Sequence, residues 1–93
     1  MRLEALVTKY IISTEKVLKE MRQSKRVVKV SEKTVSKILD YVTNYFEDAK
    51  YYKAEKKFET SLTSVAYCEG LLDALRLLGA VEFEWPAKTV KNT

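Results

Sequence analysis

Turn-forming residues are scarce in this chain of 93 residues, which contains only two glycines and one proline. A β-rich domain of this length needs many tight turns, and glycine and proline supply most of them. Long helices need turns only where one helix is joined to the next. The composition therefore predicts an all-α fold built from a few long helices.

Apolar residues recur at steps of three and four in three segments, which is the spacing of one helix face. We expect helices at about residues 2–23, 31–54 and 57–78, with Ser31 as the N-cap of the second and Gly79 as the C-cap glycine of the third. Three such helices with short connections predict a single domain, an antiparallel up-down-up three-helix bundle. The residues that we expect on the buried stripes of the second and third helices include Tyr45, Phe46, Tyr52, Phe58, Leu62, Val65, Ala66, Leu72, Leu75 and Leu78.

The segment that follows the third helix alternates apolar and acidic residues, with Glu82 and Glu84 between the apolar ones. A period of two predicts an extended arm over about residues 80–90. A lone strand cannot form a sheet, so the arm either lies along a groove of the bundle or pairs with another chain. Together with two tyrosines that lie off the main helical stripe, its apolar residues form a candidate interaction surface: Tyr41, Tyr51, Val81, Phe83 and Trp85.

Several classes of chemistry are disfavoured by what the chain lacks. It has no histidine, so catalysis by an imidazole and the common zinc sites are excluded. Cys68 is its single cysteine, which rules out an intrachain disulfide and is typical of a reducing cytoplasm. No stretch approaches the roughly 20 apolar residues that span a bilayer. We expect a cytoplasmic, non-catalytic protein that uses no cofactor, metal ion or membrane.

A stripe of small residues marks the third helix, where Ala66, Gly70 and Ala74 stand four residues apart. Small side chains let a neighbouring helix approach closely, so we predict a helix-packing seam here that also includes Glu69 and Asp73. Two carboxylates at this spacing are compatible with a divalent cation or with acid–base chemistry, but a metal ion needs more oxygen ligands. We favour one acid that is hydrogen-bonded at the seam and one that pairs with a nearby cation such as Arg76.

Positive charge is concentrated in residues 16–37, which contain eight cations and two acids in a chain of net charge +4. Clustered lysine and arginine bind the phosphates of nucleic acids by releasing counterions, and they are equally common in a solvated loop. No aromatic residue between positions 22 and 37 offers a surface on which bases stack. The candidate phosphate contacts are Arg22, Lys25, Arg26, Lys29 and Lys33.

Two motifs in the second half of the chain are distinctive. The first is an aromatic pattern at Tyr45, Phe46, Asp48, Ala49 and Tyr51; the second is the run Tyr67, Glu69, Gly70, Leu71, Leu72, Asp73 and Ala74, with Leu78 and Gly79 after it. Across about residues 40–85 the chain resembles the archaeal helical family known as domain of unknown function 357. The turn AEKK departs from the glycine-aspartate often found between such helices. The resemblance implies a small three-helix bundle from an archaeon, and it implies no established function.

Two hypotheses of function follow from these features. The first is a non-catalytic module for binding another protein or for self-association. The alternative is a nucleic-acid or nucleotide binder that uses the basic segment 16–37.

Overall fold

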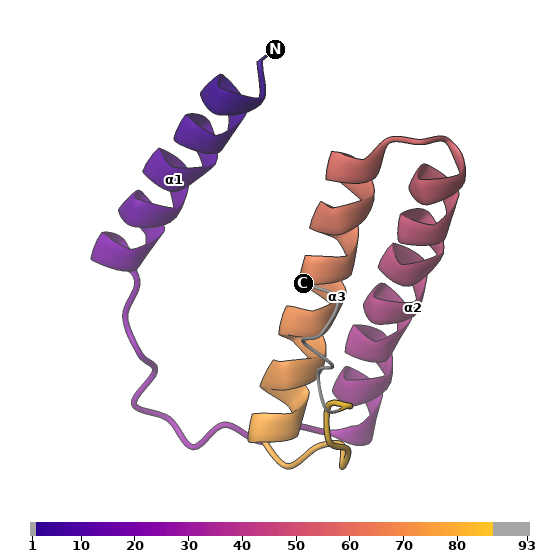
Figure 1. Ribbon diagram of the computed structural model, residues 1–93. Coiled ribbons are helices and arrows are strands. Elements are labelled where there is room, and N and C mark those ends of the chain that lie inside the picture. Colours follow the sequence, from indigo (N-terminus) through magenta and orange to yellow (C-terminus); the bar gives the residue numbers. More distant parts are fainter. Residues whose placement is uncertain (1, 87–93) are drawn as a thin grey trace.

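The computed structural model describes residues 2–86, and this part of the chain contains three α-helices. They are α1 (Leu3–Glu20), α2 (Glu32–Ala54) and α3 (Phe58–Leu77), and they run in up-down-up order (Figure 1). The predicted all-α fold with three helices is confirmed. Helix α1 ends three residues earlier than the sequence pattern suggested. Residues 87–90 of the predicted arm lie outside the described residues.

Helix α2 is fixed by a side-chain cap at its start and a backbone motif at its end. The Ser31 hydroxyl oxygen accepts a hydrogen bond from the backbone N–H of Thr34 at 3.1 Å, which confirms the predicted N-cap. At the other end Lys56 adopts a left-handed φ of 62°, and the N–H of Lys57 donates to the carbonyl of Tyr52 at 2.8 Å. This is a Schellman motif with lysine in the position that glycine usually occupies.

Helix α3 ends in the same motif with the usual residue. Gly79 has a φ of 78°. Its N–H donates to the carbonyl of Arg76 at 3.0 Å, and the N–H of Ala80 donates to the carbonyl of Leu75 at 2.9 Å. The predicted C-cap glycine is confirmed, and its left-handed conformation explains why a residue without Cβ stands there.

Helices α2 and α3 pack against each other as an antiparallel hairpin (Figure 1). The Ser61 hydroxyl donates a hydrogen bond to the carbonyl of Ala49 at 2.7 Å, and the Cys68 thiol donates to the carbonyl of Val42 at 3.3 Å. Two bonds from side chains of one helix to the backbone of the other fix how far the helices slide along each other. The buried residues are Ala49, Ser64, Cys68 and Leu75.

The buried set is smaller than the sequence pattern predicted. Tyr45 and Phe46 are 40% and 50% exposed. Tyr52, Val65 and Leu72 are only half-buried. Helix α3 turns the face with Ser64, Cys68 and Leu75 to α2, because small residues allow a close helix contact. Its other large apolar residues include three that are left exposed: Phe58, Leu62 and Leu77. The residues whose predicted burial is wrong are Tyr45, Phe46, Phe58, Leu62, Ala66 and Leu78.

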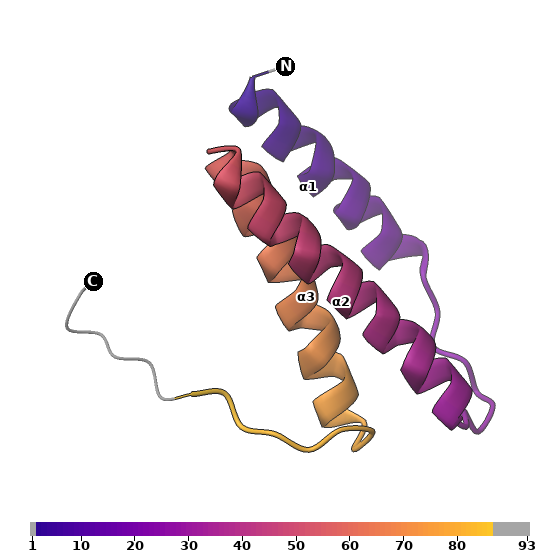
Figure 2. The ribbon, with the colours of Figure 1, turned by 90° about the vertical axis from the view of Figure 1, so that its right-hand side faces the viewer.

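Helix α1 lies alongside the hairpin without packing onto it (Figures 1 and 2). None of its residues 3–20 is buried, and no Cα atom of α1 lies within 8 Å of a Cα atom of α2 or α3. The connection from α1 to α2, residues 21–31, contains no helix or strand, and its side chains are all exposed. The close packing in this fold is therefore between α2 and α3, while the apolar stripe of α1 faces open space.

Candidate interaction groove

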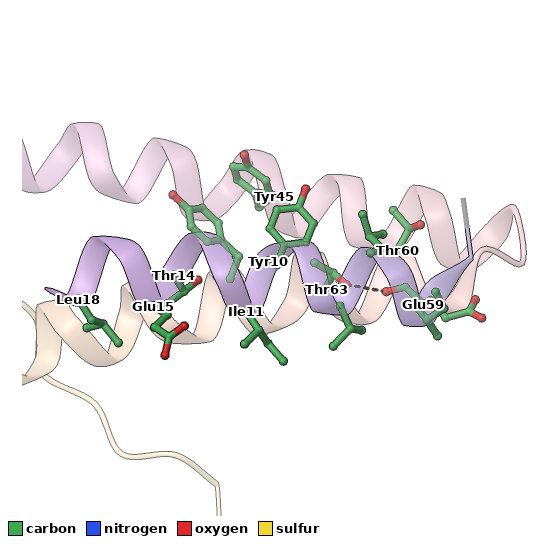
Figure 3. A pocket seen from close by; sticks show the side chains of 13 residues that line it. Tyr10, Ile11, Thr14, Glu15, Leu18, Tyr45, Glu59, Thr60 and Thr63 are labelled. Atoms are coloured by element: carbon green, nitrogen blue, oxygen red, sulfur yellow. Dashed lines mark hydrogen bonds between the residues drawn. The ribbon is translucent and has the colours of Figure 1, made fainter. Parts of the chain in front are cut away.

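A groove of about 1060 Å³ separates α1 from the α2–α3 hairpin (Figure 3). Helix α1 supplies one wall and α3, with one residue of α2, supplies the other. The wall on α1 is mostly apolar and consists of Leu3, Leu6, Val7, Tyr10, Ile11, Thr14, Glu15 and Leu18. The opposite wall consists of Tyr45, Glu59, Thr60, Thr63 and Tyr67.

Two tyrosines from neighbouring helices form the aromatic part of the hairpin wall. The rings of Tyr45 on α2 and Tyr67 on α3 have centroids 4.5 Å apart and planes inclined at 58°. Such a tilted pair holds both rings in place while leaving each of them 40% or more exposed. The hairpin therefore presents a fixed aromatic surface toward α1.

The remaining polar lining residues contribute threonine hydroxyls and two carboxylates to the groove. The Thr63 hydroxyl donates a hydrogen bond of 2.8 Å to the carbonyl of Glu59 within α3, as the dashed line in Figure 3 marks. Glu15 and Glu59 are the two charged residues among those that line the groove. An occupant would therefore meet an apolar and aromatic interior with acids at separate places on its walls.

The protein family described as "Protein of unknown function (DUF357)" matches residues 9–81 of the chain. The chain belongs to this family. The match is longer than the resemblance seen in residues 40–85, since it begins inside α1 and runs past the end of α3. No curated protein and no solved structure matches the chain.

The small-residue stripe of this DUF357 chain does not form the predicted seam. Ala66, Glu69, Gly70 and Ala74 are exposed, and a Cβ placed on Gly70 would meet no atom within 4 Å. Helix α3 uses a different face for its contact with α2, as described above. The prediction that this stripe sets the distance between packed helices is therefore wrong for α2 and α3.

Asp73 is the one predicted seam residue with specific partners. Its carboxylate accepts a hydrogen bond of 2.7 Å from the indole Nε1 of Trp85 and one of 3.2 Å from Nη2 of Arg76. The indole N–H first, and then the Arg76 guanidinium, hold the pKa of Asp73 below its ordinary value. The pairing with Arg76 was predicted, whereas the bond to Trp85 was not. Among residues 2–86 no group of three acids or cysteines is placed to hold a metal ion.

The described part of the arm lies against the end of α3 in its own chain. The Phe83 and Trp85 rings meet edge to face at 4.9 Å, and the Arg76 guanidinium stands 5.8 Å from the centre of the Phe83 ring. Val81 and Phe83 are half-buried and Glu82 and Glu84 are exposed, as the alternation predicted, whereas Trp85 is 38% exposed. Residues 80–86 thus contact the end of α3, while the predicted placement of the arm along a groove of the bundle stays a prediction.

The other predicted surface residues lie apart from the groove. Tyr41 and Tyr51 on α2 are 45% and 59% exposed, and neither of them lines it. The basic candidates are also exposed and outside the groove: Arg22, Lys25, Arg26 and Lys29 on the extended connection and Lys33 in the first turn of α2. None of these five forms an ion pair with another residue in the described range 2–86.

Cys68 has a packing role in the hairpin. Burial, more than any neighbouring group, raises the pKa of its thiol above the ordinary value. A thiol with a raised pKa stays protonated at neutral pH, which suits it as the donor to the Val42 carbonyl.

Sequence reasoning missed the groove as a whole. Its signal was the width of the apolar surface on α1, where Leu6, Ile11 and Leu18 flank the central stripe. A helix that packs on one neighbour needs only a narrow seam, whereas a wider face is typical of a helix with more than one neighbour.

In the described residues, none of the three helices is both long and apolar enough to cross a membrane.

Proposed function

We propose that this chain is a non-catalytic protein-interaction module that binds through the apolar face of α1 and the groove beside it. One observation carries the proposal. Helix α1 has an apolar stripe along its whole length, yet none of its residues is buried. Its exposed fractions include 48% for Val7 and 60% for Tyr10.

An exposed apolar surface of this size has a thermodynamic meaning. Apolar area in contact with water is unfavourable by about 25 cal/mol per Å², so covering the stripe on α1 is a source of binding free energy. Soluble proteins rarely expose contiguous apolar patches larger than a few hundred Å² unless the patch binds something. Together with the tyrosine pair on the opposite wall, α1 offers the kind of surface that a helical partner covers.

The non-catalytic part of the proposal is supported by the residues available. The chain has no histidine, its cysteine is protonated and bonded within the hairpin, and Asp73 holds the arm. A cytoplasmic location belongs to the same proposal, and it is supported by the single cysteine. Tyr41 and Tyr51 are proposed as further contacts outside the groove.

Affinity capture with matched baits tests the proposal. Val7→Glu places a charge on the groove wall, whereas Ile12→Glu places the same charge on a residue of α1 that is 60% exposed and does not line the groove. We expect the wild type and the Ile12→Glu bait to retain the same partner, which is either an unlike protein or a differently tagged copy of the chain. The Val7→Glu bait is expected to lose it. Identical captured sets for all three baits would overturn the proposal.

Nucleic-acid binding through the basic connection is a second candidate. It is favoured by four cations that are exposed on one extended segment, Arg22, Lys25, Arg26 and Lys29. If they bind phosphates, the affinity for single-stranded or duplex probes falls steeply as salt is raised. Reversing these four to glutamate should then abolish binding, while reversing Arg2, Lys9, Lys53 and Lys57, which are also exposed and lie outside the basic segment, should leave most of it. An equal loss in both variants would indicate a net-charge effect and reject the segment as a site.

A further inference from the structure

The groove is lined mainly by α1, which contributes eight of its thirteen lining residues. An occupant that fills the groove therefore contacts α1 over nearly its full length, from Leu3 to Leu18. At a rise of about 1.5 Å per residue this is a stretch of roughly 24 Å, so the matching occupant is itself a helix of similar length rather than a small molecule.

The apolar stripe of α1 has the spacing of a coiled-coil seam. Its central residues follow one another at alternating steps of four and three: Leu3, Val7, Tyr10, Thr14, Val17 and, as the C-cap, Met21. This is the heptad pattern in which the side chains of one helix fit between those of a second helix with the same pattern. None of the six is charged, so two such stripes meet without opposing like charges. Another copy of the stripe is therefore a surface that complements it.

The extent of exposed surface agrees with a missing partner of this size. A compactly folded protein of 10.8 kDa exposes about 5,500 Å² by the usual scaling with mass, and this chain exposes 8856 Å². Its radius of gyration is 16.2 Å, against about 12 Å for a compact chain of this length. A standard protein interface covers only about 800 Å² on each partner. The extended connection, residues 21–31, and the uncovered stripe of α1 both contribute to this surplus, which is several times the area that a dimer interface covers.

We infer that the occupant of the groove is α1 of a second copy of this chain. Two copies pair through their α1 stripes about a two-fold axis, so that the same patch is used on both sides. The flanking residues Leu6, Ile11 and Leu18 widen each α1 enough to touch the partner helix on one side and the tyrosine wall of a hairpin on the other. This inference rests on the proposed function, because it names the partner that the groove binds.

The mass of the purified full-length chain in solution is the first test. Light scattering after size exclusion should give about 21.6 kDa for the wild type, twice the chain mass of 10.8 kDa. Val7→Glu should reduce the mass to that of one chain, and Ile12→Glu should leave the dimer intact. Circular dichroism of each variant shows whether the helices are retained. A wild type that stays at the mass of one chain at 100 µM and above would overturn the inference.

A cross-linking experiment tests the pairing without weakening it. Thr14→Cys alone reports parallel stripes, and a mixture of Thr14→Cys with Tyr10→Cys reports antiparallel ones, because these positions then face each other across the axis. Under mild oxidation we expect disulfide-linked dimers in both samples if the stripes are parallel and only in the mixture if they are antiparallel, and we expect Ile12→Cys to form none. No cross-link in either sample would count against pairing through α1.

The outcomes separate this inference from the proposed function. A monomer whose capture of an unlike protein is lost in Val7→Glu and kept in Ile12→Glu would retain the interaction module and remove self-association. A monomer that captures nothing in a manner dependent on Val7 would remove both.

Discussion

The indole Nε1 of Trp85 donates a hydrogen bond of 2.7 Å to the carboxylate of Asp73, and this bond joins the extended arm to the last turns of α3. The same carboxylate oxygen accepts a bond from Arg76, whose guanidinium lies near the ring of Phe83. The positions of Trp85, Arg76 and Phe83 therefore depend on one ionised acid.

The contact between the arm and α3 should weaken in acid. Because the pKa of Asp73 is lowered, its stabilising contribution is present above the ordinary value of 3.8 and is lost as pH falls through the lower value in the folded chain. Trp85 is the only tryptophan, so its fluorescence reports on the arm alone. We expect its emission to shift to the red below pH 3.8, and Asp73→Ala to show the shifted emission already at pH 7.

The matched control for this titration is Glu69→Ala, which removes an exposed acid one turn away and should behave as the wild type. Circular dichroism recorded in parallel separates release of the arm from unfolding of the helices. An emission maximum that is the same in Asp73→Ala and wild type at pH 7 would contradict the contact.

The free energy of unfolding should depend strongly on the side chain of Leu75 and hardly at all on that of Leu77. Leu75 is 1% exposed and Leu77 is 78% exposed, although they stand two residues apart on α3. Leu75→Ala should lower the free energy of unfolding by about 2–5 kcal/mol, because it removes buried methyl groups and leaves a cavity. Leu77→Ala should change it by less than about 0.5 kcal/mol. Urea denaturation followed by circular dichroism measures both, and similar losses would mean that α3 is rotated from the described orientation.

Replacing each of the two glycines by alanine should change the stability of the chain in opposite directions. Gly70 lies inside α3, and a Cβ added to it would meet no neighbouring atom within 4 Å, so Gly70→Ala should stabilise the chain by about 0.5–1 kcal/mol. Gly79 has a φ of 78°, where a Cβ is strained, and Gly79→Ala should destabilise it by about 1–2 kcal/mol. Thermal unfolding measures the pair. A loss of stability in Gly70→Ala would reveal a close neighbour at that face.

Replacing Lys56 by glycine in the turn between α2 and α3 should increase the stability of the chain. Lys56 has a φ of 62°, which costs a residue with a Cβ about 1–2 kcal/mol. Lys56→Gly should stabilise the chain by a few tenths to about 1 kcal/mol, since part of the gain is offset by the greater freedom of glycine when unfolded. Lys57 has an ordinary φ of −94°, so Lys57→Gly is the control and should show no gain in denaturation midpoint.

Local features of the fold were predictable because their causes are local. Ser31 caps α2 through its own hydroxyl, and Gly79 ends α3 through its own backbone freedom. The turn at Lys56 was not predictable, because lysine carries no signal for a left-handed conformation. The face of α3 that contacts α2 was misjudged because apolar spacing does not count small polar residues, and Ser61 and Cys68 form the contact through hydrogen bonds to α2.

The candidate site was only partly predictable for a different reason. The sequence shows that α1 has an apolar stripe, but it does not show which residues of the hairpin stand opposite that stripe. Tyr45 was expected in the core because it lies on the helical period, yet it is 40% exposed on the groove wall. Burial depends on the neighbouring helix, and that neighbour stands away from the hairpin.

The extended connection between α1 and α2 is exposed to cleavage by proteases. Residues 21–31 are exposed throughout and contain Arg22, Lys25, Arg26 and Lys29, each a cleavage site for a protease of trypsin specificity. No Cα atom of α1 lies within 8 Å of a Cα atom of the hairpin helices, so the hairpin loses no close helix contact when α1 is removed. A single cut in this connection would therefore release the helix that bears the stripe and leave behind a hairpin that keeps its own core.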